Sequence, residues 1–130
     1  SALIFAPMVV VYLTSTFKKT AKRLSKKYRS LKKDLLGLIT ELEENPVKGI
    51  KIGENTYKIR LAVKSKGKGK SGGLRVITFL YSRIADTESQ EVYLLDLFDK
   101  SDLDNLPKSY IQNLVALLEQ ELTEQTQEEE

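Results

Sequence analysis

Apolar residues recur with a helical period in the first third of the chain. They fall at spacings of three and four on one side of two consecutive segments, which predicts a pair of amphipathic helices. Thr14 or Ser15 is placed to cap the first helix, and Ser30 to cap the second. Pro46 ends the second helix, because the residue before a proline disfavours helical backbone. We expect a helical hairpin with one apolar seam and a basic, solvated exterior. The apolar stripes are Phe17, Ala21, Leu24 and Tyr28, then Leu31, Leu35, Leu38, Ile39 and Leu42.

Shorter patterns predict strands in the rest of the chain. Met8–Leu13 is a β-branched and aromatic run, and Tyr57–Lys64 alternates so that its cations point away from the core. Leu74–Ile84 predicts another long strand, with a bulge or an end near Arg83. Glu91–Phe98 is apolar on both sides, as a central strand is.

Two segments complete the expected order. Val47–Asn55 fits a loop or a short strand, and Pro107 suits the first turn of a final helix. Glu119–Glu130 loses its apolar content, so we expect this acidic tail to fray. The stripe of the final helix is Ile111, Leu114, Val115, Leu118 and Leu122.

The order β-α-α-β-β-β-α predicts an α+β fold. A small, largely antiparallel β-sheet would carry the N-terminal helical hairpin and a C-terminal helix. We expect one domain over residues 9–118, preceded by an N-terminal extension or an expression remnant at 1–8 and followed by the tail at 119–130.

Composition narrows the chemistry. The 130 residues include no cysteine and no histidine, which excludes disulfides, thiolate metal sites and histidine-based triads. Residues 1–83 carry a net charge of +14 and residues 84–130 carry −11. A basic body with an acidic end is typical of a protein that binds nucleic acid or another polyanion. Residues 2–8 are apolar but too short for a membrane span and have no basic flank, so we expect a cytoplasmic protein without membrane contact.

The stretch Lys64–Tyr81 concentrates this basic character. Its first part places lysines at every second position among glycines, which let a backbone approach a ligand closely. We therefore predict a polyanion site here. A flexible, solvated hairpin loop is the competing interpretation. The lysines are Lys64, Lys66, Lys68 and Lys70, and the glycines are Gly67, Gly69, Gly72 and Gly73.

The sequence does not match the known motifs for nucleotide or metal binding. The spacing of Gly67, Gly69 and Gly72 matches a dinucleotide fingerprint, but that motif joins a strand to a helix, and here β-like residues follow directly. A Walker loop fails for the same reason. The aspartates at 96, 99, 102 and 104 lack the glycine and final glutamate of a calcium loop, so we interpret them as strand-end and helix-cap residues. No cofactor or metal is expected.

A cluster of cations remains. If the two strands around the loop pair, their basic side chains converge on one point, where they would hold a phosphodiester and stabilise the charge of its transition state. RNA suits such a site because its own 2′-OH is the nucleophile. On a competing interpretation, one or two of the cations only pair with Asp96 or Asp99. The cluster is Lys58, Arg60, Lys64, Lys68, Lys70 and Arg75.

Several of these segments resemble the RelE/HigB superfamily of bacterial type II toxins. The likeness covers roughly residues 9–118 and is strongest in the run GKGKSGGLRVI at residues 67–77, which points to a HigB-like branch. It extends to Asn45-Pro46, to Tyr57–Leu61 and to Leu97–Ser101. Family members are mostly mRNA interferases that cut translated mRNA in the ribosomal A site, and a cognate antitoxin encoded beside them keeps them silent.

The resemblance implies roles for individual residues. Arg75 corresponds to the third-strand arginine that stabilises the transition state, while Lys58 and Arg60 correspond to a basic pair that contacts the mRNA backbone. Lys68 and Lys70 belong to the branch motif, and Lys100 falls near a basic position after the last core strand. Lys64 and Lys66 would add RNA contacts.

The chain departs from the family in its proton-transfer group. Related toxins often place a tyrosine or histidine after the last strand; here there is no histidine, and Tyr110 lies further along than the pattern requires. Tyr81, on the same strand face as Arg75, is a candidate substitute that would stack on a base.

The expected function is therefore a ribosome-dependent endoribonuclease toxin. Its partners would be the ribosome, mRNA and an antitoxin, expected to be a helix-turn-helix protein encoded adjacently. Two alternatives stay open: a superfamily member that poisons another target such as DNA gyrase, and a decayed toxin that only binds its antitoxin.

Overall fold

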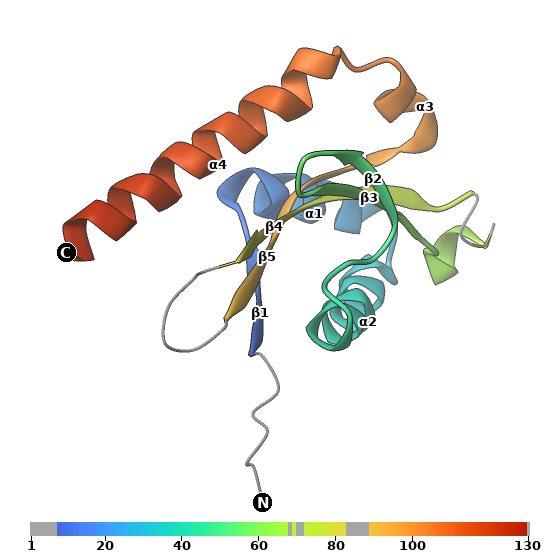
Figure 1. The fold of residues 1–130 in the computed structure, drawn as a ribbon. Coiled ribbons are helices and arrows are strands. Elements are labelled where there is room, and N and C mark those ends of the chain that lie inside the picture. The colour runs from blue at the N-terminus through green and yellow to red at the C-terminus, as the bar shows by residue number, and fades with distance from the viewer. Residues whose placement is uncertain (1–7, 68, 70–71, 83–88, 130) are drawn as a thin grey trace, which may run out of the picture.

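The protein folds around a five-stranded sheet with helices on both faces (Figure 1). The computed structural model describes residues 8–67, 69, 72–82 and 89–129. This is the α+β class that the sequence predicts. In chain order the elements are β1 (Val9–Leu13), α1 (Ser15–Lys27), α2 (Leu31–Glu44), β2 (Ile50–Gly53), β3 (Thr56–Leu61), the 3-10 turn η1 (Lys64–Lys66), β4 (Leu74–Ser82), β5 (Gln90–Asp99), α3 (Lys100–Asp104) and α4 (Lys108–Glu129).

The strand order is β1-β5-β4-β3-β2. Neighbouring strands are antiparallel except β1 and β5, which run parallel. The prediction of a largely antiparallel sheet is confirmed, and the parallel pair makes it mixed. The short strand β2 resolves the open choice at Val47–Asn55, and α3 is a helix where we expected only a strand end.

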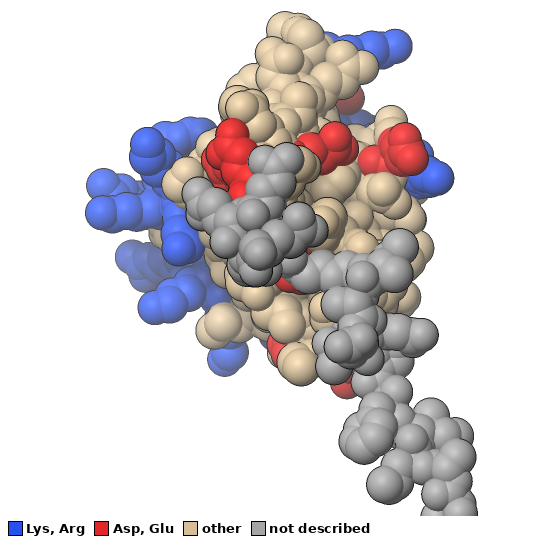
Figure 2. Space-filling model, turned by 60° about the vertical axis from the view of Figure 1, so that its left-hand side comes forward, with Lys and Arg blue, Asp and Glu red and all other residues tan. Residues whose placement is uncertain are grey.

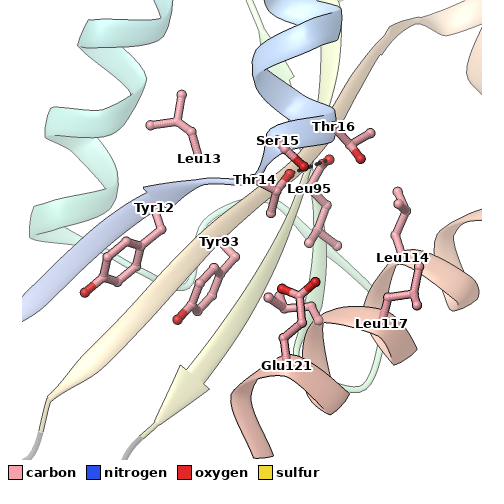
Figure 3. Close-up of a pocket in the computed structure, with 11 residues that line it drawn as sticks. Tyr12, Leu13, Thr14, Ser15, Thr16, Tyr93, Leu95, Leu114, Leu117 and Glu121 are labelled. Atoms are coloured by element: carbon pink, nitrogen blue, oxygen red, sulfur yellow. Dashed lines mark hydrogen bonds between the residues drawn. The ribbon is translucent and has the colours of Figure 1, made fainter. Parts of the chain in front are cut away.

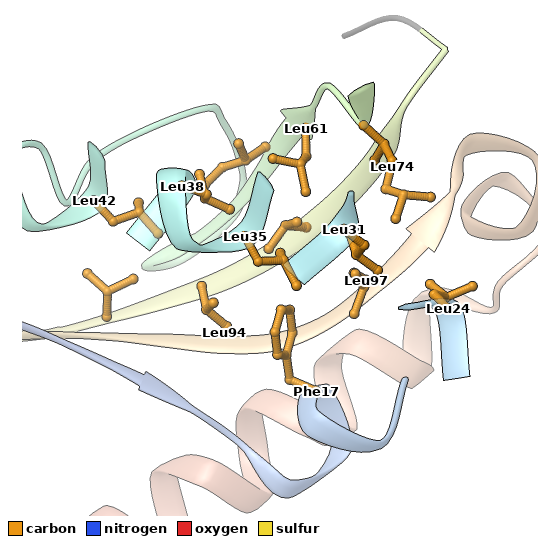
Figure 4. Packing of buried hydrophobic residues seen from close by; sticks show 14 of the residues in the cluster. Phe17, Leu24, Leu31, Leu35, Leu38, Leu42, Leu61, Leu74, Leu94 and Leu97 are labelled. Atoms are coloured by element: carbon orange, nitrogen blue, oxygen red, sulfur yellow. The ribbon is translucent and has the colours of Figure 1, made fainter. Parts of the chain in front are cut away.

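The helical hairpin packs on one face as its pattern predicts. Every residue of the two predicted stripes lies in or against the larger hydrophobic cluster, and Phe17, Leu31 and Leu42 are fully buried (Figure 4). Thr14 caps α1 by accepting a hydrogen bond from the Phe17 amide at 3.2 Å. Ser30 occupies the cap position of α2 but makes no side-chain cap bond.

Helix α4 covers the opposite face (Figure 1). The apolar stripe predicted for this helix packs against Ile77, Phe79 and Leu95 of the sheet. Leu118, a member of the stripe, is buried. We expected the tail to fray from Glu119 onward, whereas in the structure α4 continues to Glu129. Leu122 is 3% exposed and holds this part of the helix on the sheet.

A bulge in β5 changes what faces α4. Ile77 of β4 pairs with Asp96 of β5, and the next residue, Thr78, pairs with Leu94. Leu95 therefore has no partner on β4 and is the extra residue of the bulge. Leu95 and Asp96 both lie on the α4 side, since one belongs to the second cluster and the other bonds to Tyr110 of α4. The irregularity we expected near Arg83 falls outside the described residues.

Candidate nucleic-acid interface

Three predicted site residues come together on β3 and β4. Arg60 lies directly opposite Arg75, and Lys58 lies opposite Ile77, so all three are on the α4 face of the sheet. Directly opposite residues have their Cβ atoms about 5 Å apart. The two arginines are therefore close enough to hold one anionic group.

Arg60 and Arg75 differ in their access to solvent. Arg60 is exposed, whereas Arg75 is 4% exposed. The Arg75 side chain also donates from Nη1 to the carbonyl of Leu74 at 3.4 Å. Its cross-strand neighbour on β5 is Phe98, an aromatic residue of the α4-side cluster. The sequence placed Arg75 correctly on the sheet, but it did not show this burial.

The first part of the glycine-lysine stretch is fixed to the helical hairpin. Ser65 Oγ lies 2.9 Å from Ser30 Oγ, and the Ser65 amide donates to Ser30 Oγ at 2.8 Å. Asp34 accepts from the Lys64 amide at 3.2 Å and from the Ser30 hydroxyl at 2.7 Å. This Ser30–Asp34–Ser65 clasp gives the loop a defined base. The interpretation as a wholly flexible hairpin does not hold at residues 64–66.

Lys66 forms an ion pair rather than an open cationic site. Its Nζ lies 2.5 Å from Asp99 Oδ1, both side chains are about one-fifth exposed, and the hydrogen bond raises the pKa of Lys66. The ammonium also sits 5.4 Å from the centre of the Tyr28 ring, and the Tyr28 hydroxyl lies 3.4 Å from Asp99. Asp99 thus pairs with Lys66, which was predicted as an RNA contact and not as a member of the six-cation cluster.

The other end of the loop requires glycine. A Cβ at Gly73 would overlap the carbonyl oxygen of Leu61 on the neighbouring strand. Gly73 also lines a cavity of about 340 Å³ together with Lys66, Asp99 and Lys100. Lys100 is exposed at the start of α3, so the structure brings it to the base of the loop. Lys68 and Lys70 lie outside the described residues, and β4 follows the loop without a helix, in agreement with the rejection of nucleotide-loop motifs.

Tyr110 is a residue whose placement the sequence did not reveal. Its hydroxyl donates to Asp96 Oδ2 at 2.7 Å, and its ring meets Phe98 edge-on at 6.0 Å. Burial, together with this bond to Asp96, raises the pKa of Tyr110 to about 12, so it keeps its proton at neutral pH. It covers the same side of the sheet as Arg75. Tyr81, the predicted substitute, is partly buried against the α4-side cluster.

Larger cavities lie away from these cations. One of about 390 Å³ lies between β1, β5, the start of α1 and the middle of α4, and is lined by the stacked pair Tyr12 and Tyr93, by Leu117 and by Glu121 (Figure 3). Another, of about 670 Å³, lies between β2 and α4. The first has no Lys or Arg in its lining and the second has only Lys108, so neither matches the predicted site.

Comparisons leave the family of the chain open. No model of a known protein family matches it, and no curated protein is significantly similar to it. Within the described part of the chain, no helix is both long and apolar enough to cross a membrane. The described acidic side chains form no group of three or more that could hold a metal ion.

Proposed function

We propose that the protein is an endoribonuclease toxin of a type II toxin–antitoxin system that cleaves mRNA on the ribosome. The observation that carries the proposal is the cross-strand pair of Arg60 and Arg75, with Lys58 on the same face. The resemblance of residues 67–77 to HigB-like toxins supports it, as does a fold consistent with the small α+β fold of that superfamily.

The chemistry needs no metal. The 2′-OH of one nucleotide attacks the adjacent phosphorus, the bond from phosphorus to the 5′ oxygen breaks, and a 2′,3′-cyclic phosphate and a 5′-OH are formed. One proton leaves the 2′-OH and one reaches the 5′ oxygen. Arginine binds phosphate through a planar fork of N–H donors, and such donors stabilise the charge that develops on the phosphoryl oxygens. Arg75 and Arg60 would supply that stabilisation.

Replacing Arg75 tests the proposal. Arg75→Ala should relieve growth arrest on expression, and Arg75→Lys should relieve it in part, because lysine keeps the charge but loses the fork. Lys51→Ala is the control, since Lys51 is an exposed cation on β2 outside the arginine pair. Circular dichroism and thermal melting establish that each variant is folded. A folded Arg75→Ala protein that still arrests growth fully would exclude this role.

The burial of Arg75 favours one rival function. An arginine that is 4% exposed does not reach a substrate unless its surroundings open. A toxin that poisons another target, such as DNA gyrase, would use Arg75 only to maintain the fold. Mapping of mRNA ends in cells separates the two: codon-phased cuts indicate the nuclease, and intact mRNA with DNA damage indicates the poison.

A further inference from the structure

The exposed residues from Thr16 to Lys33, over α1, the connecting turn and the start of α2, are all cations. Figure 2 shows that lysine and arginine side chains gather densely on one side of the molecule. The exposed cations from Thr16 to Lys33 are Lys18, Lys19, Lys22, Arg23, Lys26, Lys27, Arg29, Lys32 and Lys33.

The arrangement is unfavourable for an isolated helix. In α1 the cations repeat at i and i+4 in two rows, and like charges at this spacing destabilise a helix by about 0.2–0.5 kcal/mol per pair. The first turn of α1 contains no acidic residue. Among the described residues the ion pairs are Lys48–Glu41 and Lys66–Asp99, and neither involves this surface. A bound polyanion would offset the repulsion.

The exposed face of α1 carries no apolar side chain, although Leu36 is exposed further along α2, and this favours nucleic acid as the polyanion. The core of a protein–protein interface is rich in aromatic and apolar residues, and a helix that inserts into a membrane presents an apolar side. Here the apolar side of α1 faces the core through Phe17 and Leu24, and nothing but charge remains outside. Rows of cations one helical turn apart suit the regularly spaced phosphates of a nucleic acid backbone.

This surface is separate from the arginine pair but runs into the base of the loop. The hairpin packs on one face of the sheet, whereas Arg60 and Arg75 lie on the other. At the end of α1, Lys27 lies 5.3 Å from the centre of the Tyr28 ring, over which Lys66 also sits. The surface thus ends beside Tyr28, next to the base of the glycine-lysine stretch.

We propose that the exposed cations of α1 and the start of α2 form a second nucleic-acid surface, which binds the phosphate backbone of RNA without reading its sequence. The choice of RNA over DNA rests on the proposed function, because the surface ends at the predicted RNA site. The binding itself does not require cleavage.

A charge-matched pair of variants tests this surface. Lys19→Gln/Arg23→Gln removes two charges from α1, and Lys51→Gln/Lys108→Gln removes two exposed charges from β2 and α4. Binding of a fluorescent RNA hairpin is measured over a salt series. Each lost phosphate contact lowers the slope of log K against log salt by about 0.7 to 0.9. The α1 variant should therefore lose about 1.4 to 1.8 in slope, and the control should keep its slope.

The outcomes separate the possible partners. Equal losses in both variants, or none in either, would overturn the proposal. Competition by poly-glutamate as strong as that by RNA at equal charge would assign the surface to an acidic protein instead. Tighter binding of the corresponding DNA hairpin would overturn the choice of RNA. The comparison measures binding and not cleavage, so a failed growth-arrest test of Arg75→Ala would leave this result intact.

Discussion

Arg60 on β3 lies directly opposite Arg75 on β4, so two guanidinium groups share one face of the sheet. Like charges in this position destabilise a sheet, by an amount similar to the 0.2–1 kcal/mol or so that favourable pairs contribute. An anion bound beside the two arginines would offset this repulsion.

Arg60→Gln should stabilise the free protein by roughly 0.2–1 kcal/mol while weakening RNA binding. Thermal melting in low salt, with and without a short single-stranded RNA, measures both effects. Lys51→Gln serves as the control, because it removes an exposed charge from β2. A less stable Arg60→Gln protein with unchanged RNA affinity would show that Arg60 has a structural role.

The ion pair between Lys66 and Asp99 leads us to expect a loss of stability when Lys66 is replaced. Lys66→Met should lower the free energy of unfolding by about 1–2 kcal/mol, between the values for exposed and buried ion pairs, because Asp99 loses its partner. Lys64→Met should change it little, since Lys64 is exposed and its contact with Asp34 runs through its backbone amide. Urea denaturation compares the two. Equal stability of both variants would argue against the ion pair in solution.

Gly73 and Gly37 predict opposite effects of the same substitution. Gly73→Ala should destabilise the protein by about 1–3 kcal/mol or more, because the new methyl group meets the Leu61 carbonyl. Gly37→Ala in α2 should stabilise it by roughly 0.5–1 kcal/mol, since the space around Gly37 is open and alanine favours helix. Melting temperatures of the two variants give the comparison. The close approach of β3 to Gly73 would be refuted by a neutral Gly73→Ala.

Tyr110 predicts a change of stability at alkaline pH. Its folded pKa, about 12, exceeds the ordinary value of 10.0, so the folded state holds this proton more tightly than the unfolded state. The stabilising contribution is complete below pH 10 and is lost as the pH rises to about 12. The difference in melting temperature between wild type and Tyr110→Phe should shrink over this range. A difference that stays constant to pH 12 would rule out the bond to Asp96.

The sequence predicted the buried sides of α1 and α2 correctly, over Phe17–Tyr28 and Leu31–Leu42. Apolar residues spaced at the helical period show directly which side of a helix is buried. The same holds for the alternation that placed Arg60 away from the larger cluster. Local patterns of this kind predict most of the helices and strands and which side of each is buried.

What the sequence did not show depends on residues far apart in the chain. The bulge at Leu95 turns Asp96 toward Tyr110, and the pairing of Lys66 with Asp99 joins positions 33 residues apart. Leu122 is one apolar residue among polar ones, and its place in the cluster under α4 is a tertiary contact that the local pattern does not record. The burial of Arg75 likewise follows from packing rather than from its neighbours in sequence.

The clasp of Ser30, Asp34 and Ser65 has a consequence for engineering. Because it fixes the backbone at residues 64–66 to the start of α2, a segment grafted after Gly67 would leave the domain from a defined point and direction. Gly67 itself has a φ of +71° and open space around it, so the graft would retain this glycine as its first hinge. The scaffold would thus present inserted loops beside the arginine-bearing strands without a redesign of the core.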